Sequence, residues 1–85
     1  MKIIKKCEKI FFEKILTGEK NFEVRLGDLK VENGDLLILK EVNEGKETGR
    51  SIEKKVGFVV KINDLPYWST EEKNKHGFTI IQLEN

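Results

Sequence analysis

The chain has 85 residues, with 16 basic and 15 acidic side chains and a net charge of +1. This length predicts one domain that spans residues 1–85 and has a small core. The nearly even charge disfavours a protein that grips duplex nucleic acid through its phosphates, because such proteins carry a clear basic excess. A nucleic-acid ligand would therefore be held in a local pocket or groove.

The cysteine content and the hydropathy pattern predict a cytoplasmic protein, and we expect a monomer. Cys7 is the only cysteine, so an internal disulfide is excluded, and a lone thiol is typical of a reducing compartment. One cysteine and one histidine, His76, cannot form a zinc cage, and we expect neither a metal nor another cofactor. No 18-residue apolar run is present, and residues 1–6 do not read as a secretion signal, so we expect no membrane contact.

The N-terminal third predicts a strand followed by a helix. Residues 2–6 read as a short opening strand. Residues 8–16 predict an amphipathic helix, because their apolar side chains recur at spacings of three and four. We assign both Phe11 and Phe12 to the core face of this helix. Gly18 follows the last apolar residue, where a left-handed helix end is expected.

Residues 21–25 predict a strand with two different faces. Successive side chains of a strand point to opposite sides of the sheet. We therefore expect Phe22 and Val24 to face the core, and Glu23 and Arg25 to share the other face.

The middle of the chain predicts two strands that form a hairpin. A turn at 33–35 precedes residues 36–42, whose run of leucine and isoleucine is typical of a strand buried on both faces. Residues 43–50 are polar and read as the hairpin loop. Residues 51–62 then alternate and predict a long strand with one apolar face, in which Gly57 permits a bulge.

The C-terminal part predicts a loop, a short helix and a closing strand. Residues 63–69 form the loop, and residues 70–75 follow a capping box and predict a short helix. Residues 78–83 predict the last strand, with Phe78 and Ile80 on one face.

Three sequence elements, in this order, resemble ASCH domains of the PUA-like superfamily. The pattern Gly-x-Lys-x-x-Glu-x-Arg is filled at every position by Gly18, Lys20, Glu23 and Arg25. A Gly-Asp turn with its strand follows at 34–41, and a Thr-Gly-Arg turn at 48–50 is similar to that of a phage and bacterial subgroup of unknown function. The resemblance runs from about Lys5 to the C-terminus. It implies a mainly β (α+β) fold: a PUA-like small β-barrel of about five to six strands, with one clear helix and a short second helix.

The first candidate site combines Lys20, Glu23 and Arg25. Arginine offers a planar fork of donors to a phosphate or a base edge, lysine a compact charge, and glutamate an acceptor for an exocyclic amine. The alternative is a structural salt bridge, which needs no function. The resemblance to ASCH domains favours the binding site.

Two further candidates are weaker on sequence alone. Thr48 and Arg50, with Lys40, could extend the first site, or they could form a solvated hairpin tip. Tyr67 and Trp68 could stack on bases, or they could plug the end of the barrel. We interpret His76 as an ordinary surface residue.

The resemblance implies a nucleic-acid or nucleotide binding module that takes RNA, another single strand or a modified base into a cleft beside the barrel. One alternative is an amidohydrolase acting on N4-acylated cytidine. Related enzymes use a Lys-x-x-Thr pair with a threonine nucleophile, but Glu23 stands at the threonine position here, with Lys20 in place. We therefore do not predict an enzyme. A protein-interaction adaptor is the third alternative.

Overall fold

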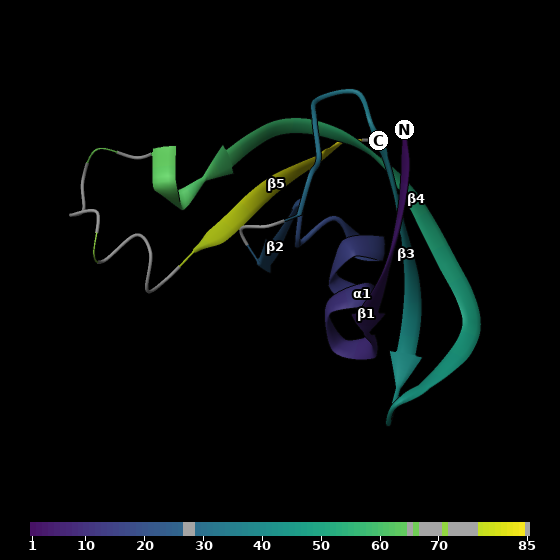
Figure 1. The fold of residues 1–85 in the computed structure, drawn as a ribbon. Helices are drawn as coiled ribbons and strands as arrows, with labels where there is room; N and C mark the ends of the chain where they lie inside the picture. Colours follow the sequence, from purple (N-terminus) through teal and green to yellow (C-terminus); the bar gives the residue numbers. More distant parts are fainter. Residues whose placement is uncertain (27–28, 65, 67–70, 72–76, 85) are drawn as a thin grey trace.

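The computed structural model describes residues 1–26, 29–64, 66, 71 and 77–84. The prediction of a mainly β fold with a helix near the N-terminus is confirmed (Figure 1). In chain order the elements are β1 (Lys2–Glu8), α1 (Lys9–Thr17), β2 (Phe22–Leu26), β3 (Leu36–Asn43), β4 (Lys46–Lys61), a 3₁₀ turn η1 (Ile62–Asp64) and β5 (Phe78–Glu84). The second helix predicted at 70–75 falls almost entirely outside the described residues.

The five strands form one mixed sheet in the order β1-β3-β4-β5-β2. β1 runs parallel to β3, and the other three pairings are antiparallel. β4 is long enough to pair with β3 along its first part and with β5 along its last, and it bends between the two (Figure 1). This bend brings the two edge strands, β1 and β2, toward each other.

The predicted barrel is wrong in one respect, because the sheet does not close. No strand pairing joins β1 to β2 within the described residues. Helix α1 follows β1 directly and packs into the open side of the sheet, against β1 and β3. Side chains of the helix thus fill the opening that a pairing between β1 and β2 would close in a complete barrel.

The core lies between α1 and the concave side of the sheet. Phe12 and Ile15 are fully buried and pack in one cluster with Leu37 and Leu39 of β3. The assignment of Phe11 to this core is wrong, because its side chain is 50% exposed. Neighbouring residues on a helix are about 100° apart around the axis, so Phe11 and Phe12 cannot face the same core equally.

The β3–β4 hairpin has a shorter turn than the sequence predicted. Glu44 and Gly45 alone connect the strands, and both adopt positive φ, at 52° and 80°. Two consecutive residues with positive φ are typical of a type I′ turn, whose twist matches that of the two flanking strands. The loop predicted at 43–50 is therefore wrong in extent, and Thr48 and Arg50 lie within β4.

Gly57 marks a bulge in β4, as predicted. The register between β4 and β5 shifts between Val56 and Val59. Val56 is fully buried, whereas Phe58 is 68% exposed. The prediction of one continuous apolar face along 51–62 is consequently wrong beyond Gly57, because the extra residue turns the following side chains over.

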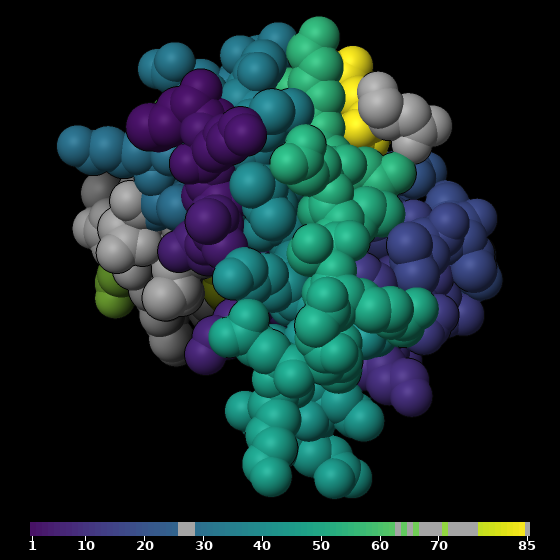
Figure 2. Space-filling view, turned by 90° about the vertical axis from the view of Figure 1, so that its right-hand side faces the viewer, coloured from purple at the N-terminus to yellow at the C-terminus, as the bar shows by residue number. Residues whose placement is uncertain are grey.

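The outer face of β3 is less buried than predicted. Leu37 and Leu39 are fully buried on the inner face, but Leu36 and Ile38 are only partly covered. Figure 2 shows β1, β3 and β4 running side by side on this outer face. Within the part of the chain that the structure describes, no helix has the length and apolarity needed to cross a membrane.

The two neighbouring phenylalanines of α1 provide a test of this packing. We expect Phe12→Ala to lower the free energy of unfolding by about 3–5 kcal/mol, because a fully buried ring leaves a cavity. Phe11→Ala, the matched control, should cost less than about 1 kcal/mol. Urea unfolding followed by circular dichroism measures both, and equal losses would contradict the assignment of the core face.

Candidate functional site

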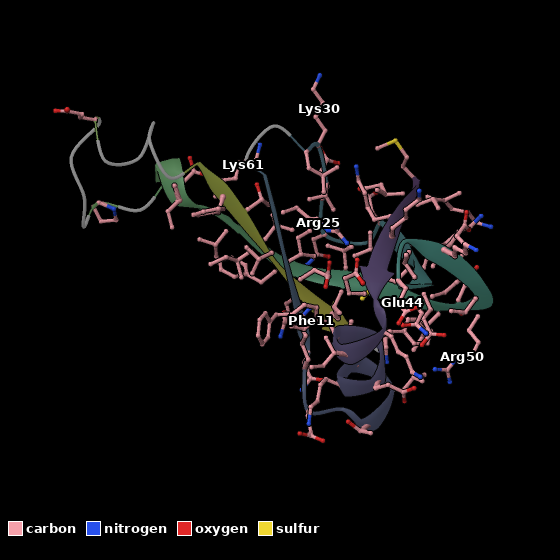
Figure 3. The ribbon with its side chains drawn as sticks, turned by 90° about the horizontal axis from the view of Figure 1, so that it is seen from below. Phe11, Arg25, Lys30, Glu44, Arg50 and Lys61 are labelled. Atoms are coloured by element: carbon pink, nitrogen blue, oxygen red, sulfur yellow. The ribbon has the colours of Figure 1, made fainter. Side chains whose placement is uncertain are left out.

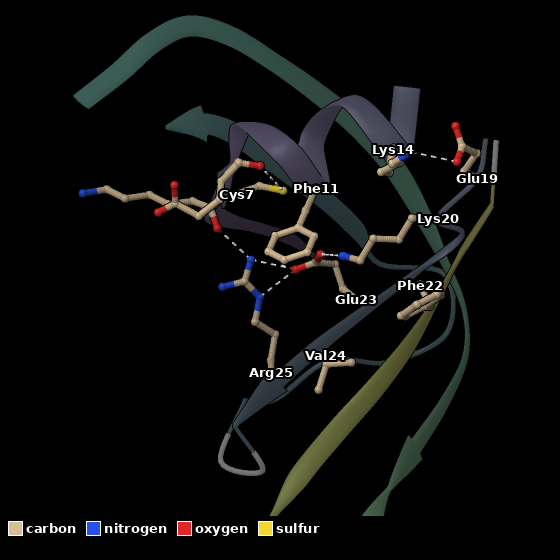
Figure 4. Close-up of a pocket in the computed structure, with 11 residues that line it drawn as sticks. Cys7, Phe11, Lys14, Glu19, Lys20, Phe22, Glu23, Val24 and Arg25 are labelled. Carbon is tan, nitrogen blue, oxygen red and sulfur yellow. Dashed lines mark hydrogen bonds and ion pairs between the residues drawn. The ribbon is translucent and has the colours of Figure 1, made fainter. Parts of the chain in front are cut away.

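The two unpaired sheet edges, β1 and β2, face each other across a gap that we call the seam. The guanidinium of Arg25 on β2 bridges the seam, with Nη2 donating to the carbonyl oxygen of Lys6 on β1 at 2.7 Å. A cavity of about 580 Å³ opens here, and we call it the seam pocket (Figure 4). Its lining residues come from β1, α1 and β2 and are Lys6, Cys7, Glu8, Phe11, Lys14, Glu19, Lys20, Phe22, Glu23, Val24 and Arg25.

The structure brings Lys20, Glu23 and Arg25 into direct contact in this pocket. Glu23 is 4% exposed, and its Oε1 accepts a hydrogen bond from the ammonium of Lys20. Its Oε2 accepts from Arg25, at 2.9 Å from Nε and 2.7 Å from Nη2. One buried carboxylate therefore holds two cations in fixed positions, and both cations keep part of their surface exposed.

The predicted faces of β2 are reversed in the structure. Glu23 points inward, whereas Phe22 and Val24 are about half exposed. Among the described strands β2 pairs with β5 alone, and its inner side faces the seam and α1. A carboxylate can occupy this inner position because two cations compensate the cost of removing its charge from water.

Two aromatic rings flank Lys20 at the mouth of the pocket. The ammonium lies 5.4 Å from the ring centroid of Phe11 and the same distance from that of Phe22. Both contacts are within the range of a cation–π interaction. Sequence reasoning missed these rings as site residues, although adjacent phenylalanines in a helix already indicate that one of them turns away from the core.

Cys7 lines the pocket but is poorly suited to act as a nucleophile. Its thiol is buried, and burial together with the negative charge of Glu23 raises its pKa above the ordinary value of a cysteine. The reactive form of cysteine is the thiolate, which such surroundings disfavour at neutral pH.

Thr48 and Arg50 belong to a second polar cluster, centred on the buried carboxylate of Glu41. Arg50 donates two hydrogen bonds to Glu41, from Nε to Oε1 at 2.9 Å and from Nη2 to Oε2 at 2.6 Å. The hydroxyl of Thr48 also donates to Oε1. Arg50 also bonds Glu13 of α1 at 2.6 Å. The hydrogen bonds from Arg50, and then that from Thr48, lower the pKa of Glu41 to about 2. This arrangement ties the hairpin to the helix.

The second cluster does not join the seam pocket. Arg50 lies well away from Phe11 and Arg25 (Figure 3), and its guanidinium is occupied by two carboxylates. Lys40 is exposed on the outer face, and its ammonium lies 3.7 Å from a carboxylate oxygen of Glu47. Lys40, Thr48 and Arg50, which the sequence suggested as an extension of the first site, are thus separate from it.

Tyr67, Trp68 and His76 lie outside the described residues. Among the residues that are described, no three His, Cys, Asp or Glu side chains are grouped to hold a metal ion.

Fold and site together define a class: small mixed-sheet proteins with a charged pocket where the sheet fails to close. The chain belongs to the family described as "Domain of unknown function (DUF3850)", whose model matches residues 2–79. It is similar to the "Uncharacterized 12.9 kDa protein in GpA 3'region" of Escherichia phage P2, at 39% identity over 54 residues. That match covers 64% of this chain and 50% of the relative, so the chain spans about half the length of the relative it matches.

A solved structure supports the fold. The chain superposes on the crystal structure of hypothetical protein PH0355 with a TM-score of 0.68, covering 99% of this chain and 98% of the other. Sequence identity is 19%, so this likeness shows the fold alone. The predicted resemblance to a phage and bacterial group of unknown function is confirmed in part, because the chain belongs to a family of unknown function and is similar to a phage protein.

The second cluster predicts a pH dependence of stability. The ordinary pKa of a glutamate is 4.5, and that of Glu41 is about 2 in the folded protein, so its ion pair stabilises the fold above pH 4.5. This stabilisation is lost as pH falls from 4.5 toward 2. We expect Glu41→Gln to flatten the fall of the urea midpoint in this window. Glu47→Gln, an exposed control, should not; equal slopes in all three proteins would contradict the assignment.

Proposed function

We propose that this chain is a nucleic-acid or nucleotide binding module of the ASCH, PUA-like type, and that its ligand occupies the seam pocket. One observation carries the proposal: the buried carboxylate of Glu23 fixes both Lys20 and Arg25, and the ammonium of Lys20 lies against two half-exposed aromatic rings. Charged donors and planar apolar surfaces are the two kinds of group that recognise a nucleotide.

The charge balance of the triad favours an anionic or electron-rich ligand. Two cations share one carboxylate, so the three side chains together carry a charge of +1. Nε of Arg25 contacts Glu23, and Nη2 contacts both Glu23 and the carbonyl of Lys6. Nη1 therefore has no protein partner among the described residues. A free guanidinium nitrogen beside an ammonium suits a phosphate oxygen or the acceptor edge of a base.

The rings and the size of the pocket suit a base. Phe11 and Phe22 are 50% and 46% exposed, and stacking on such a ring contributes about 1–3 kcal/mol per base. The pocket volume of about 580 Å³ lies within the range of small-molecule sites. Because the chain as a whole is nearly neutral, we expect modest affinity that depends on the pocket more than on long-range attraction.

The hydrolase alternative has less support. The residues that line the pocket include no serine or threonine, so no hydroxyl nucleophile is available from them. Lys20 is held in an ion pair with Glu23 rather than beside a nucleophile. Glu23 could activate a water molecule only after leaving two cationic partners. The adaptor alternative draws no support from the pocket.

Ligand titration followed by backbone amide NMR tests the proposal. The ligands are cytidine, cytidine 5′-monophosphate and N4-acetylcytidine. We expect shifts to cluster at the pocket residues, around Lys20 to Arg25. The Arg25→Gln variant and the charge-balanced double variant Lys20→Gln/Glu23→Gln should each bind about tenfold more weakly or worse, because charge-assisted hydrogen bonds contribute about 1.5–3 kcal/mol.

Lys30→Gln provides the matched control, since Lys30 is exposed and does not line the pocket. It should bind like the unaltered protein. Unchanged affinity in both pocket variants would place the ligand elsewhere and contradict the proposal. Release of acetate from N4-acetylcytidine above the buffer rate would favour the hydrolase instead.

A further inference from the structure

The outer face of β2, β5 and β4 exposes several large apolar side chains. The best exposed are Phe22, Val24, Phe58, Phe78 and Ile80, all between 38% and 68% accessible. Contiguous apolar surface of this kind on a small soluble domain usually marks a place where another molecule binds. We call these five residues the platform.

The strand register arranges the platform in rows across three strands. Val24, Ile80 and Val60 form an aliphatic row, since Ile80 pairs with both of the others. In the next row Gln82 of β5 is directly opposite Phe22. Its Oε1 accepts a hydrogen bond from the backbone N–H of Phe58 at 2.9 Å. An amide therefore lies between two exposed aromatic residues.

Gly57 makes this row possible. The bulge at this position turns Phe58 outward and frees its N–H from the strand ladder. A Cβ at position 57 would lie 2.5 Å from Oε1 of Gln82, which is closer than a Cβ carbon comes to another heavy atom in real proteins. Glycine leaves room for the amide to bond to Phe58, whereas a Cβ here would make the end of the Gln82 side chain move away.

The platform is continuous with the seam pocket. Phe22 and Val24 line the pocket and also belong to the exposed face (Figure 4). A chain of nucleotides with one member in the pocket would therefore pass directly onto the neighbouring aromatic surface.

We propose that the platform stacks the bases of a single-stranded nucleic acid, one nucleotide of which occupies the seam pocket. The inference rests on the proposed function and extends it from a single nucleotide to a strand. Exposed aromatic residues on a sheet face are a common means of holding unpaired bases.

The amide of Gln82 favours bases over a purely apolar partner. Because Oε1 is used by Phe58, the donor group Nε2 has no partner among the described residues. Such an amide can bond to a base edge, whereas an apolar partner would leave it buried and unsatisfied. A second copy of this chain is the competing occupant, and the experiment below separates the two.

The test compares one nucleotide with a strand. Fluorescence anisotropy and competition measure binding of cytidine 5′-monophosphate and of single-stranded oligonucleotides of about eight nucleotides. We expect the oligonucleotide to bind at least about tenfold more tightly, because stacking on the platform adds to the contacts made in the pocket.

The double variant Phe58→Leu/Phe78→Leu keeps the face apolar and removes only the rings. It should lose at least about tenfold in affinity for the oligonucleotide and none for the mononucleotide. Ile4→Leu, an aliphatic exchange at an exposed position of β1 outside the platform and the pocket, is the control and should change neither. Gly57→Ala should weaken only the oligonucleotide, because it displaces Gln82.

Several results would overturn the inference. One is equal affinity for the nucleotide and the strand, and another is undiminished strand binding by Phe58→Leu/Phe78→Leu. A dimer in sedimentation velocity that the strand does not dissociate would assign the platform to a second copy. If the oligonucleotide binds no more tightly than the mononucleotide, but the mononucleotide still binds through Lys20 and Arg25, the proposed function stands and the platform inference alone fails. If the strand binds through the platform regardless of those two cations, the pocket assignment fails instead.

Discussion

The burial of one carboxylate, Glu23, is the constraint on which the rest of the site depends. A buried charge is costly unless it is paired and hydrogen-bonded, and removing one partner leaves the others unsatisfied. Lys20 and Arg25 satisfy Glu23 from both sides, and Arg25 also reaches the opposite sheet edge. The same contacts thus stabilise the strand β2 at the edge of the fold and orient the cations of the pocket. Structure and proposed function share a single network.

The open seam explains why a pocket exists at all in so small a domain. A closed barrel would have filled the space between β1 and β2 with a backbone ladder. Here a side chain, Arg25, makes the connection, and α1 fills the interior with Phe12. The room left over is bounded by Phe11 and Phe22, which the helix and the edge strand turn outward. The outer face then continues from Phe22 across β5 to the bulge of β4.

Local patterns in the sequence predicted the elements well, and their faces less well. The helix ends at Gly18 and the bulge lies at Gly57, both as expected, because a glycine at such a place has few alternative explanations. Alternation correctly separated Phe22 from Glu23 but assigned the wrong one to the interior, since hydrophobicity alone does not reveal that two cations will compensate a buried carboxylate. The contact of Arg50 with Glu41 depends on register across the hairpin, which no local pattern encodes.

A crystal structure of the protein with cytidine 5′-monophosphate tests the central claim most directly. We predict density for the phosphate or a base edge beside the ammonium of Lys20 and Nη1 of Arg25, with the ring of the base against Phe11 or Phe22. The carboxylate of Glu23 should keep both of its cationic partners in the complex. A well-ordered pocket that binds only water at saturating nucleotide, or a nucleotide bound elsewhere, would contradict the account and leave the triad as a structural ion pair.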